Sequence, residues 1–230
     1  SATYMGYAFA MTSTSRRARP NPGFTTLSFL ALTLMSLLLV ASFAVQPRTF
    51  APVGLTKGLG ARVVLDVMFD SRGFLWVASR EGLFRYDGYE ARAYLPDSAN
   101  PASISAADIS VVYEAADGII WVGTNTGGVD RFDPATGVFS NYRRDSGDAA
   151  SLTDDSVQDI AEGPLGHLWV ATSKGLSRLD HGTGRFEHFA AGSQSSAALS
   201  ARAADLHLGA SETLWVGTMG AGVSRWNPDG

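Results

Sequence analysis

The side chains that could perform catalysis are scattered along this sequence. Four histidines are present, His167, His181, His188 and His207, and they fall at different distances from any shared motif. Metal sites and activated nucleophiles both need several such groups that converge on one point. A serine elbow, a phosphate-binding loop and a paired-histidine metalloprotease motif are all missing from the sequence. The sequence therefore predicts no catalytic residues, no metal site and no cofactor.

Acidic side chains are concentrated in one stretch, at Asp145, Asp148, Asp154 and Asp155. Carboxylates are calcium ligands, but this spacing matches no calcium-binding loop. We therefore interpret the stretch as a solvated loop.

An arginine recurs at a fixed place, as Arg85, Arg131, Arg178 and Arg225. Four arginines in register could form an anion-binding ring. A residue that recurs in every repeat is more typical of a scaffold, so we expect these side chains to bond neighbouring carbonyls or carboxylates.

The arginines belong to a repeat that is organised around four tryptophans, Trp76, Trp121, Trp169 and Trp215. Their separations of 45, 48 and 46 positions are typical of propeller blades. The apolar stretch around each tryptophan is short, rich in β-forming residues and bounded by glycine-bearing turns, which indicates a strand. One repeat cannot bury both of its apolar faces, but repeats stacked side by side can, with each tryptophan between two neighbours.

The sequence thus predicts an all-β fold, a β-propeller of four-stranded antiparallel blades. About four blades are present, at residues 54–95, 104–142, 152–189 and 199–230. The strand before each tryptophan strand is expected at residues 63–69, 109–114, 157–161 and 204–208. Inter-blade loops are expected at residues 97–105, 145–153 and 192–200. An apolar residue lies 16 or 17 positions before each tryptophan, namely Leu59, Ile104, Leu152 and Leu199, and the last three fall in these loops.

The N-terminal part of the chain has the pattern of an export signal. Three arginines, Arg16, Arg17 and Arg19, precede an uncharged apolar run at residues 24–45. This run suits a secretory signal peptide cleaved after Ala44, and it is also long enough for an uncleaved membrane anchor. We divide the chain into an upstream extension (1–10), a signal peptide or anchor (11–45) and propeller repeats (46–230). The repeats are expected in the periplasm, attached to the bacterial inner membrane.

Composition excludes several other classes of protein. The net charge is −4 and no basic patch is visible, which argues against nucleic acid as a partner. The absence of cysteine excludes disulfides, zinc sites built on thiolates and thiol catalysis.

The sequence stops at Gly230, in a turn that should lead to the fourth strand of the last blade. In one interpretation the four blades close as a small ring, and residues 48–53 supply the last strand. In the other, the chain is the N-terminal part of a longer protein whose ring has more blades. We favour the second interpretation, because a closing element is missing after the fourth repeat.

Residues 50–230 resemble the two-component regulator propeller repeats of bacterial membrane sensors. The resemblance rests on Gly58-Leu59, the segment from Asp70 to Trp76, Gly82-Leu83, Arg85-Tyr86-Asp87-Gly88 and Ser151-Leu152-Thr153. It implies the periplasmic sensor region of a hybrid histidine kinase or diguanylate cyclase, and a ring of seven blades. In such proteins a β-sandwich, a transmembrane helix and a cytoplasmic output module follow the propellers, and none of these occurs within the 230 residues.

Ligand specificity is expected where the repeats differ from one another on one face. Loops after the tryptophan strands and loops between blades should emerge together, because both connect strands that run in the same sense. Their polar side chains could bind a sugar or a peptide through hydrogen bonds. The candidate ligand-binding residues are Arg80, Glu81, Asn125, Lys174, Asp108, Asp154 and Arg202. Ordinary loop polarity is the alternative for each of them.

The function predicted from these observations is a non-catalytic, periplasmic ligand-sensing propeller, the input region of a membrane-bound signal-transduction protein. Its expected partners are an unknown small molecule, the membrane, and a second copy in a homodimer of the full-length protein. An exported protein-interaction scaffold is the first alternative. A propeller-fold lyase or lactonase is the second, and it would need a histidine or acid cluster at the mouth of the channel.

Overall fold

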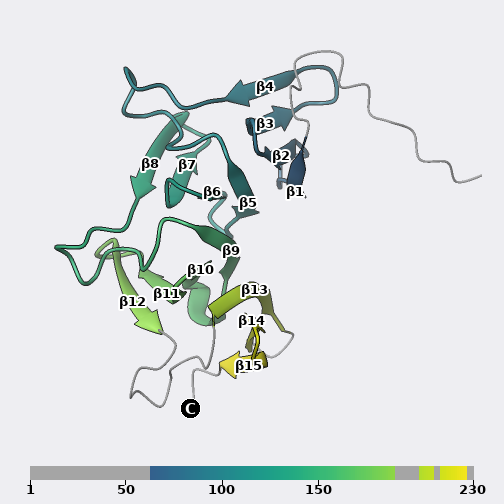
Figure 1. Ribbon diagram of the computed structural model, residues 1–230. Helices are drawn as coiled ribbons and strands as arrows, with labels where there is room; N and C mark the ends of the chain where they lie inside the picture. The colour runs from purple at the N-terminus through teal and green to yellow at the C-terminus, as the bar shows by residue number, and fades with distance from the viewer. Residues whose placement is uncertain (1–62, 190–201, 210–212, 227–230) are drawn as a thin grey trace, which may run out of the picture. The chain divides into compact units, whose positions relative to one another are not determined.

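The computed structural model describes residues 63–189, 202–209 and 213–226, which form four antiparallel sheets (Figure 1). The first sheet holds β1 (Val64–Phe69), β2 (Leu75–Ser79), β3 (Gly82–Tyr86) and β4 (Ala91–Tyr94). The second holds β5 (Ile109–Glu114), β6 (Ile120–Thr124), β7 (Val129–Asp133) and β8 (Val138–Tyr142). The third holds β9 (Val157–Glu162), β10 (Leu168–Thr172), β11 (Gly175–Asp180) and β12 (Arg185–Phe189). The fourth holds β13 (Arg202–Leu208), β14 (Leu214–Met219) and β15 (Gly222–Trp226).

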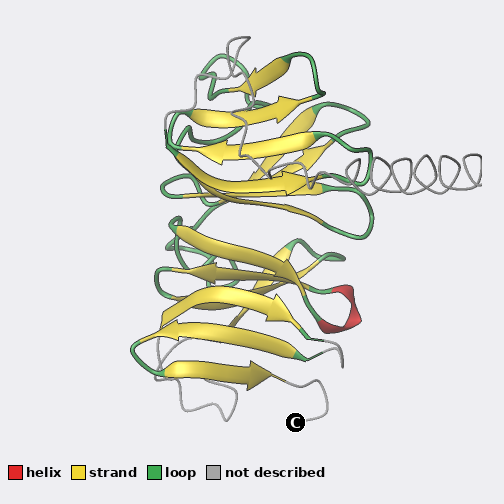
Figure 2. Ribbon diagram, turned by 90° about the vertical axis from the view of Figure 1, so that its right-hand side faces the viewer, coloured by secondary structure: helices red, strands yellow, loops and turns green. Residues whose placement is uncertain are grey.

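The fold is a β-propeller, and the expected four-stranded antiparallel blades are confirmed. In each sheet the strands lie in sequence order, so every neighbour is reached through a tight turn. The strands are drawn in yellow in Figure 2, where the short 3₁₀ turn at Pro164–Gly166 is red. The expected strand before each tryptophan strand agrees with β1, β5, β9 and β13 to within two residues. The fourth blade has three strands within the described residues.

Several expectations fall on residues that the structure does not describe. These are the signal peptide or anchor at 11–45, the closing strand at 48–53, the apolar repeat positions Leu59 and Leu199, and the loop at 192–200. Within the described ranges, no helix has the length and hydropathy to cross a membrane.

The tryptophans lie between blades, as the repeat predicts. Trp76, Trp121 and Trp169 are at most 2% exposed. The Trp76 ring lies 5.6 Å from the ring of Phe132 in the next blade, and the Trp169 ring lies 4.8 Å from that of Trp226. Trp215, in the last blade, is 42% exposed. The burial of each tryptophan therefore depends on the blade that follows it.

The inter-blade loops at 97–105 and 145–153 have the same internal pattern of hydrogen bonds. In the second loop Asp145 accepts a bond from the backbone of Gly147, and Asp148 accepts one from Ala150. Asp97 and Asn100 hold the first loop in the same way. The acidic stretch is therefore more than solvated polarity, because Asp145 and Asp148 fix the turns of the loop.

Each of these loops is anchored through the residue after its buried apolar position. Ser105, which follows the buried Ile104, donates from its backbone N and from Oγ to Asp130 Oδ2 at 3.0 and 2.7 Å. In the next blade Thr153 Oγ1 lies 3.0 Å from Ser177 Oγ. The loop is therefore tied to the third strand of the blade that follows it.

Two of the four recurring arginines, Arg85 and Arg178, pack on aromatic rings, which the sequence did not predict. The Arg85 guanidinium lies 4.5 Å from the centre of the Phe74 ring. Arg178 lies over Trp169 and also pairs with Glu187. Bonding to a carboxylate, as expected from the sequence, occurs at Arg178, and cation–π stacking is the contact common to these two residues.

Candidate functional site

In the first three blades, the loop after the tryptophan strand contacts the residue that precedes the first strand of the same blade, which we call the inner strand. The backbone N of Arg80 donates to Val63 O at 3.2 Å, and that of Asn125 donates to Asp108 O at 2.9 Å. Ser173 and Ser156 make the same contact at 2.9 Å. Both kinds of loop therefore emerge at one edge of the blades. We call this edge the loop face, and the sequence-derived candidate residues all lie on it.

Within the loop face the candidate residues pair locally. Lys174 Nζ lies 2.9 Å from Asp154 Oδ2. Partial burial raises the pKa of Asp154, but hydrogen bonds from Lys174 and Ser156 outweigh it, so the pKa of this carboxyl falls below its ordinary value. Arg202 donates to Gln158 Oε1 at 3.3 Å. The structure thus brings Asn125 to Asp108 and Lys174 to Asp154.

The remaining two candidates lie near the start of β1. Glu81 Oε2 accepts a bond from the backbone N of Val63 at 3.4 Å, and the Arg80 side chain is exposed. The loop face therefore carries both charges, with its cationic side chains more exposed than Asp154. This mixture suits a neutral ligand rich in hydrogen-bonding groups.

Two aspartates on the inner strands connect neighbouring blades. Asp66 Oδ2 accepts the backbone N–H of Val112 in the next blade at 3.0 Å, and Asp159 Oδ2 accepts that of Leu206 at 2.6 Å. Each inner strand carries a β-bulge near this level. Each inner strand is the edge strand of its sheet, so alternate backbone N–H groups lack a ladder partner, and the two carboxylates accept such groups at Val112 and Leu206.

Asp159 faces a shared acidic environment. Burial raises its pKa to about 6, hydrogen bonds from Leu206 and Ile160 oppose the change, and the charges of Asp205 and Asp66 add to it. Asp66 and Asp205 belong to the first and fourth blades, so carboxylates of two other blades act on Asp159. Among the described residues, no group of three histidine or acidic side chains is arranged to hold a metal ion.

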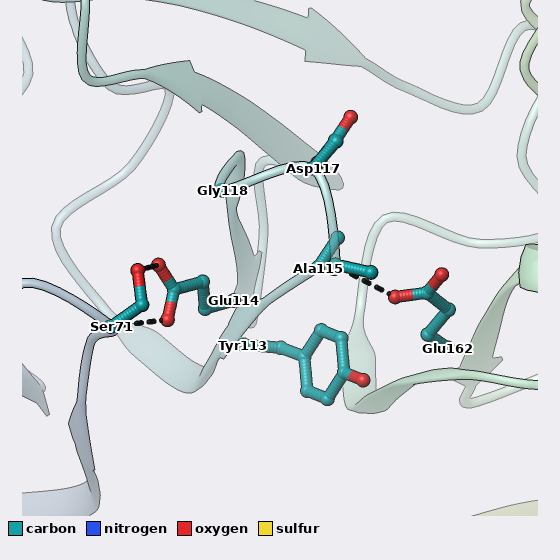
Figure 3. Close-up of a pocket in the computed structure, with 8 residues that line it drawn as sticks. Ser71, Tyr113, Glu114, Ala115, Asp117, Gly118 and Glu162 are labelled. Atoms are coloured by element: carbon teal, nitrogen blue, oxygen red, sulfur yellow. Dashed lines mark hydrogen bonds between the residues drawn. The ribbon is translucent and has the colours of Figure 1, made fainter.

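A cavity of about 560 Å³ lies at the opposite edge of the blades, at the turns between first and second strands (Figure 3). Its lining residues are Ser71, Tyr113, Glu114, Ala115, Ala116, Asp117, Gly118 and Glu162. Glu114 accepts bonds from the backbone N and the Oγ of Ser71 at 2.6 and 2.7 Å. Glu162 accepts one from the backbone N of Ala116 at 2.8 Å. These bonds join each turn to the next blade.

The chemistry of this cavity is acidic. Three carboxylates and a phenol line it, and none of the lining residues is a cation. Burial raises the pKa of the Tyr113 phenol, and the charge of Glu162 raises it further. A cationic or hydroxyl-rich group would be the matching occupant. The sequence analysis did not identify this cavity, although glutamate stands seven positions before the tryptophan in both the second and the third blade.

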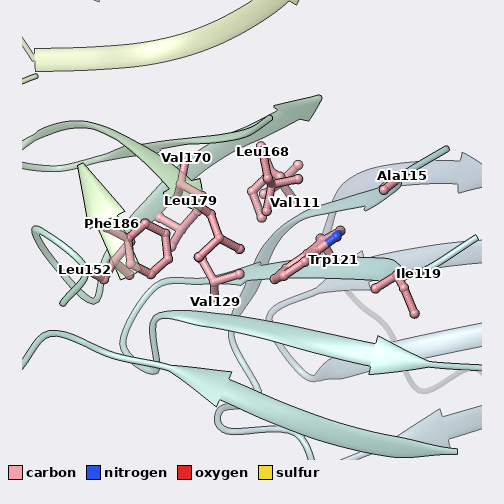
Figure 4. Packing of buried hydrophobic residues seen from close by; sticks show 12 residues of the cluster. Val111, Ala115, Ile119, Trp121, Val129, Leu152, Leu168, Val170, Leu179 and Phe186 are labelled. Carbon is pink, nitrogen blue, oxygen red and sulfur yellow. The ribbon is translucent and has the colours of Figure 1, made fainter. Parts of the chain in front are cut away.

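The tryptophan indoles differ in how their N–H groups are satisfied. Trp76 Nε1 donates to Asp70 Oδ2 at 2.9 Å, whereas Trp121 Nε1 is buried and has no partner. Ala115 occupies the position of Asp70, six residues before its tryptophan, in a turn with the same backbone bonds. In Figure 4 the indole nitrogen of Trp121 is turned toward the side of the cluster that holds Ala115 and Ile119.

Ala115→Asp is therefore expected to stabilise the protein. The new carboxylate would accept the buried indole N–H, and one such hydrogen bond contributes about 1 kcal/mol to the free energy of unfolding. Urea unfolding followed by circular dichroism measures the change. Gly163→Asp is the matched control, because a Cβ at Gly163 would lie 2.3 Å from the Trp169 ring. It should destabilise the protein, and a loss of stability in Ala115→Asp as well would contradict the expectation.

Comparison with known proteins supports the repeat assignment. Residues 103–126 match the family model described as "Two component regulator propeller". No curated protein matches the chain.

Solved structures extend the similarity to most of the chain. The extracellular domain of a protein described as a hybrid two component system from B. thetaiotaomicron is 27% identical, with a TM-score of 0.68. The match covers 78% of this chain and 25% of that one. The chain therefore spans about a quarter of the length of that domain.

Two further structures share the fold alone. One is described as a gluconolactonase and is 20% identical, with a TM-score of 0.51, over 73% of this chain and 61% of that chain. The other, a protein of unknown function from Bacteroides thetaiotaomicron, is 14% identical with a TM-score of 0.51, over 70% of this chain and 46% of that chain. At these identities the likeness carries no inference about substrates.

Proposed function

We propose that this chain, which carries two-component regulator propeller repeats, is a non-catalytic ligand-sensing propeller in the periplasm. It would form part of the input region of a membrane-bound signal-transduction protein, either a sensor kinase or a diguanylate cyclase. The observation that carries the proposal is the 27% identity, over 78% of this chain, to the extracellular domain of a hybrid two component system. The matched repeat at 103–126 supports it independently.

Ligand contact is proposed on the loop face, at the residues that differ between blades. Arg80 and Asn125 are the sharpest candidates, because among the described residues no ion pair or hydrogen bond engages their side chains, and they project from equivalent loops. Binding there would change the relative placement of subunits, and this change would be transmitted across the membrane. The acidic cavity at the opposite edge is a second candidate site, suited to cations.

Ligand binding and the location of the binding site can be tested together with two probes. Maltohexaose is the probe for the loop face, and trilysine is the probe for the acidic cavity. A saturable rise in Tm with maltohexaose, with the sugar recovered unchanged by mass spectrometry, is the expected result. Arg80→Ala combined with Asn125→Ala should raise the Kd for maltohexaose about tenfold, which corresponds to about 1.4 kcal/mol. Glu114→Gln is the matched control and should leave this Kd unchanged.

Other results would favour other functions. Chemical conversion of the sugar would support the enzyme alternative. Stabilisation by trilysine that is lost in Glu114→Gln would move the binding site to the acidic cavity. Protection of residues 63–226 from protease added to spheroplasts would contradict the periplasmic location.

A further inference from the structure

Three polar side chains lie close together on the loop face of the second blade. Asp108 directly precedes β5, Ser110 is the residue at the bulge of that strand, and Asn125 directly follows β6. The backbone bond of 2.9 Å from Asn125 N to Asp108 O holds two of them side by side. We call these three residues the open set. It combines a carboxylate, a hydroxyl and a carboxamide.

The polar atoms of the open set lack partners. Asp108 Oδ1 and Ser110 Oγ are both buried, and neither has a hydrogen-bond partner in the described part of the chain. Within the same ranges no ion pair engages Asp108, and no hydrogen bond engages the Asn125 side chain. A carboxylate that is withdrawn from water without a partner destabilises a fold. A binding role would explain why such groups are kept at this place.

The third blade shows how the same positions look when they are satisfied. Ser156 and Gln158 stand where the second blade has Asp108 and Ser110, and Ser156 Oγ accepts a bond from Gln158 Nε2 at 3.2 Å. Gln158 Oε1 in turn accepts one from Arg202 at 3.3 Å. The loop-face carboxylate of that blade, Asp154, has Lys174 at 2.9 Å. The polar groups are therefore paired in the third blade and open in the second.

The chemistry of the open set suits neighbouring hydroxyl groups. A carboxylate only accepts hydrogen bonds, whereas a carboxamide both donates and accepts. A sugar hydroxyl can donate its proton to Asp108 while an adjacent hydroxyl oxygen accepts from the amide of Asn125. An ammonium group would satisfy the carboxylate, but it has no acceptor for the amide N–H groups.

We propose that the open set binds a pair of neighbouring hydroxyls of a neutral sugar. Asp108 accepts the proton of one hydroxyl, Asn125 donates to the oxygen of the next, and Ser110 supplies a further hydroxyl beside them. This assignment rests on the proposed function, since it places the ligand of the loop face on one particular blade.

Nuclear magnetic resonance of the ¹⁵N-labelled full chain, titrated with maltohexaose, tests the contact. The side-chain amide resonance of Asn125, identified by its loss in Asn125→Asp, should shift saturably. The amide of Asn141 is the internal reference and should not move, because its nitrogen already donates to Gly127 O and Asp130 Oδ1 at 2.8 and 3.1 Å. Per-O-methylated maltohexaose has no hydroxyl protons to donate and should cause no shift. Failure of maltohexaose, cellohexaose and mannohexaose alike to shift Asn125 would overturn the proposal.

Asp108→Asn separates a binding role from a structural one. The substitution keeps the shape and removes the charge, so the Kd for the sugar that binds should rise about tenfold, as expected for one charge-assisted hydrogen bond. The Tm of the unliganded variant should not fall, because the carboxylate has no partner to lose. Ser156→Ala is the matched control at the equivalent position of the third blade, and it should leave the Kd unchanged.

Two results with these variants would contradict the proposal. A lower Tm in Asp108→Asn with an unchanged Kd would mean that the carboxylate supports the fold. An equal loss of affinity in Ser156→Ala would mean that the second blade is not the specific contact.

The open set and the sensing role can each fail alone. A rise in Tm with maltohexaose that Asp108→Asn does not alter would overturn binding by the open set and leave sensing on the loop face intact. Protection of the blades from protease in spheroplasts would overturn the periplasmic role and leave sugar binding by Asp108 intact. Loss of trilysine binding in Asp108→Asn, with sugar binding unchanged, would show that the open set takes a cation and not a pair of hydroxyls.

Discussion

Trp169→Ala is expected to lower the free energy of unfolding by about 3–5 kcal/mol, which is typical of removing a fully buried aromatic side chain. Trp169 is 0% exposed, and its ring lies 5.0 Å from that of Phe189 and 4.8 Å from that of Trp226. Trp215→Ala makes the same chemical change at the equivalent position of the last blade. With 42% of that side chain exposed, the loss should be about 1 kcal/mol.

Both tryptophan variants are compared with the wild-type chain in the same buffer. Urea unfolding followed by circular dichroism gives the two free energies, with coincident fluorescence as the test for two-state behaviour. Equal losses at the two positions would show that Trp215 is buried as fully as Trp169. That outcome would contradict the view that each tryptophan is buried by the following blade.

The largest pH effect is expected from Asp130, whose side chain is completely buried. Burial raises its pKa from 3.8 to about 6, although hydrogen bonds from Ser105 and Asn141 oppose the rise. In the unfolded chain the pKa returns to its ordinary value, so the folded state binds the proton more tightly. The stabilisation is therefore complete below about pH 4 and is lost as the pH rises through about 6. A shift of this size corresponds to about 3 kcal/mol.

The free energy of unfolding should accordingly increase as the pH is lowered from 7 to about 4.5, in a series of urea titrations. Asp159 contributes with the same sign, because its pKa is also raised to about 6. Asp130→Asn removes one of the two groups, and the pH dependence should become shallower even if the variant is less stable at every pH. A slope that is unchanged in the variant would show that Asp130 does not titrate in this range.

The fold was predictable because its main signal is local and repeated. An apolar strand around a tryptophan, a glycine-bearing turn and a fixed period define the blade without knowledge of long-range contacts. The turn acids Asp145 and Asp148 illustrate the limit. Their spacing excluded a calcium loop, but their role in fixing the turns depends on which backbone N–H groups the folded loop leaves free.

The candidate site was less predictable because its geometry depends on register between blades. The shared loop face followed from strand direction alone. Glu114 and Glu162 could not be placed, because their partners are backbone groups in the preceding blade rather than residues with a motif. The contacts of Asp66 and Asp159 cross to backbone N–H groups of the next blade, so no residue type announces them. Asp130 resembles an ordinary strand aspartate until Ser105 and Asn141 are seen to surround it.

The carboxylates of Asp66 and Asp159 have a consequence for how the protein opens. Asp66 accepts N–H groups from its own strand and from the second blade, and Asp159 does the same for the third and fourth blades. At the joint between the second and third blades the corresponding residue is Val111, which cannot accept such bonds. Amide protons near these joints should therefore exchange with solvent in pairs of blades, so that the cooperative opening unit is two repeats rather than one.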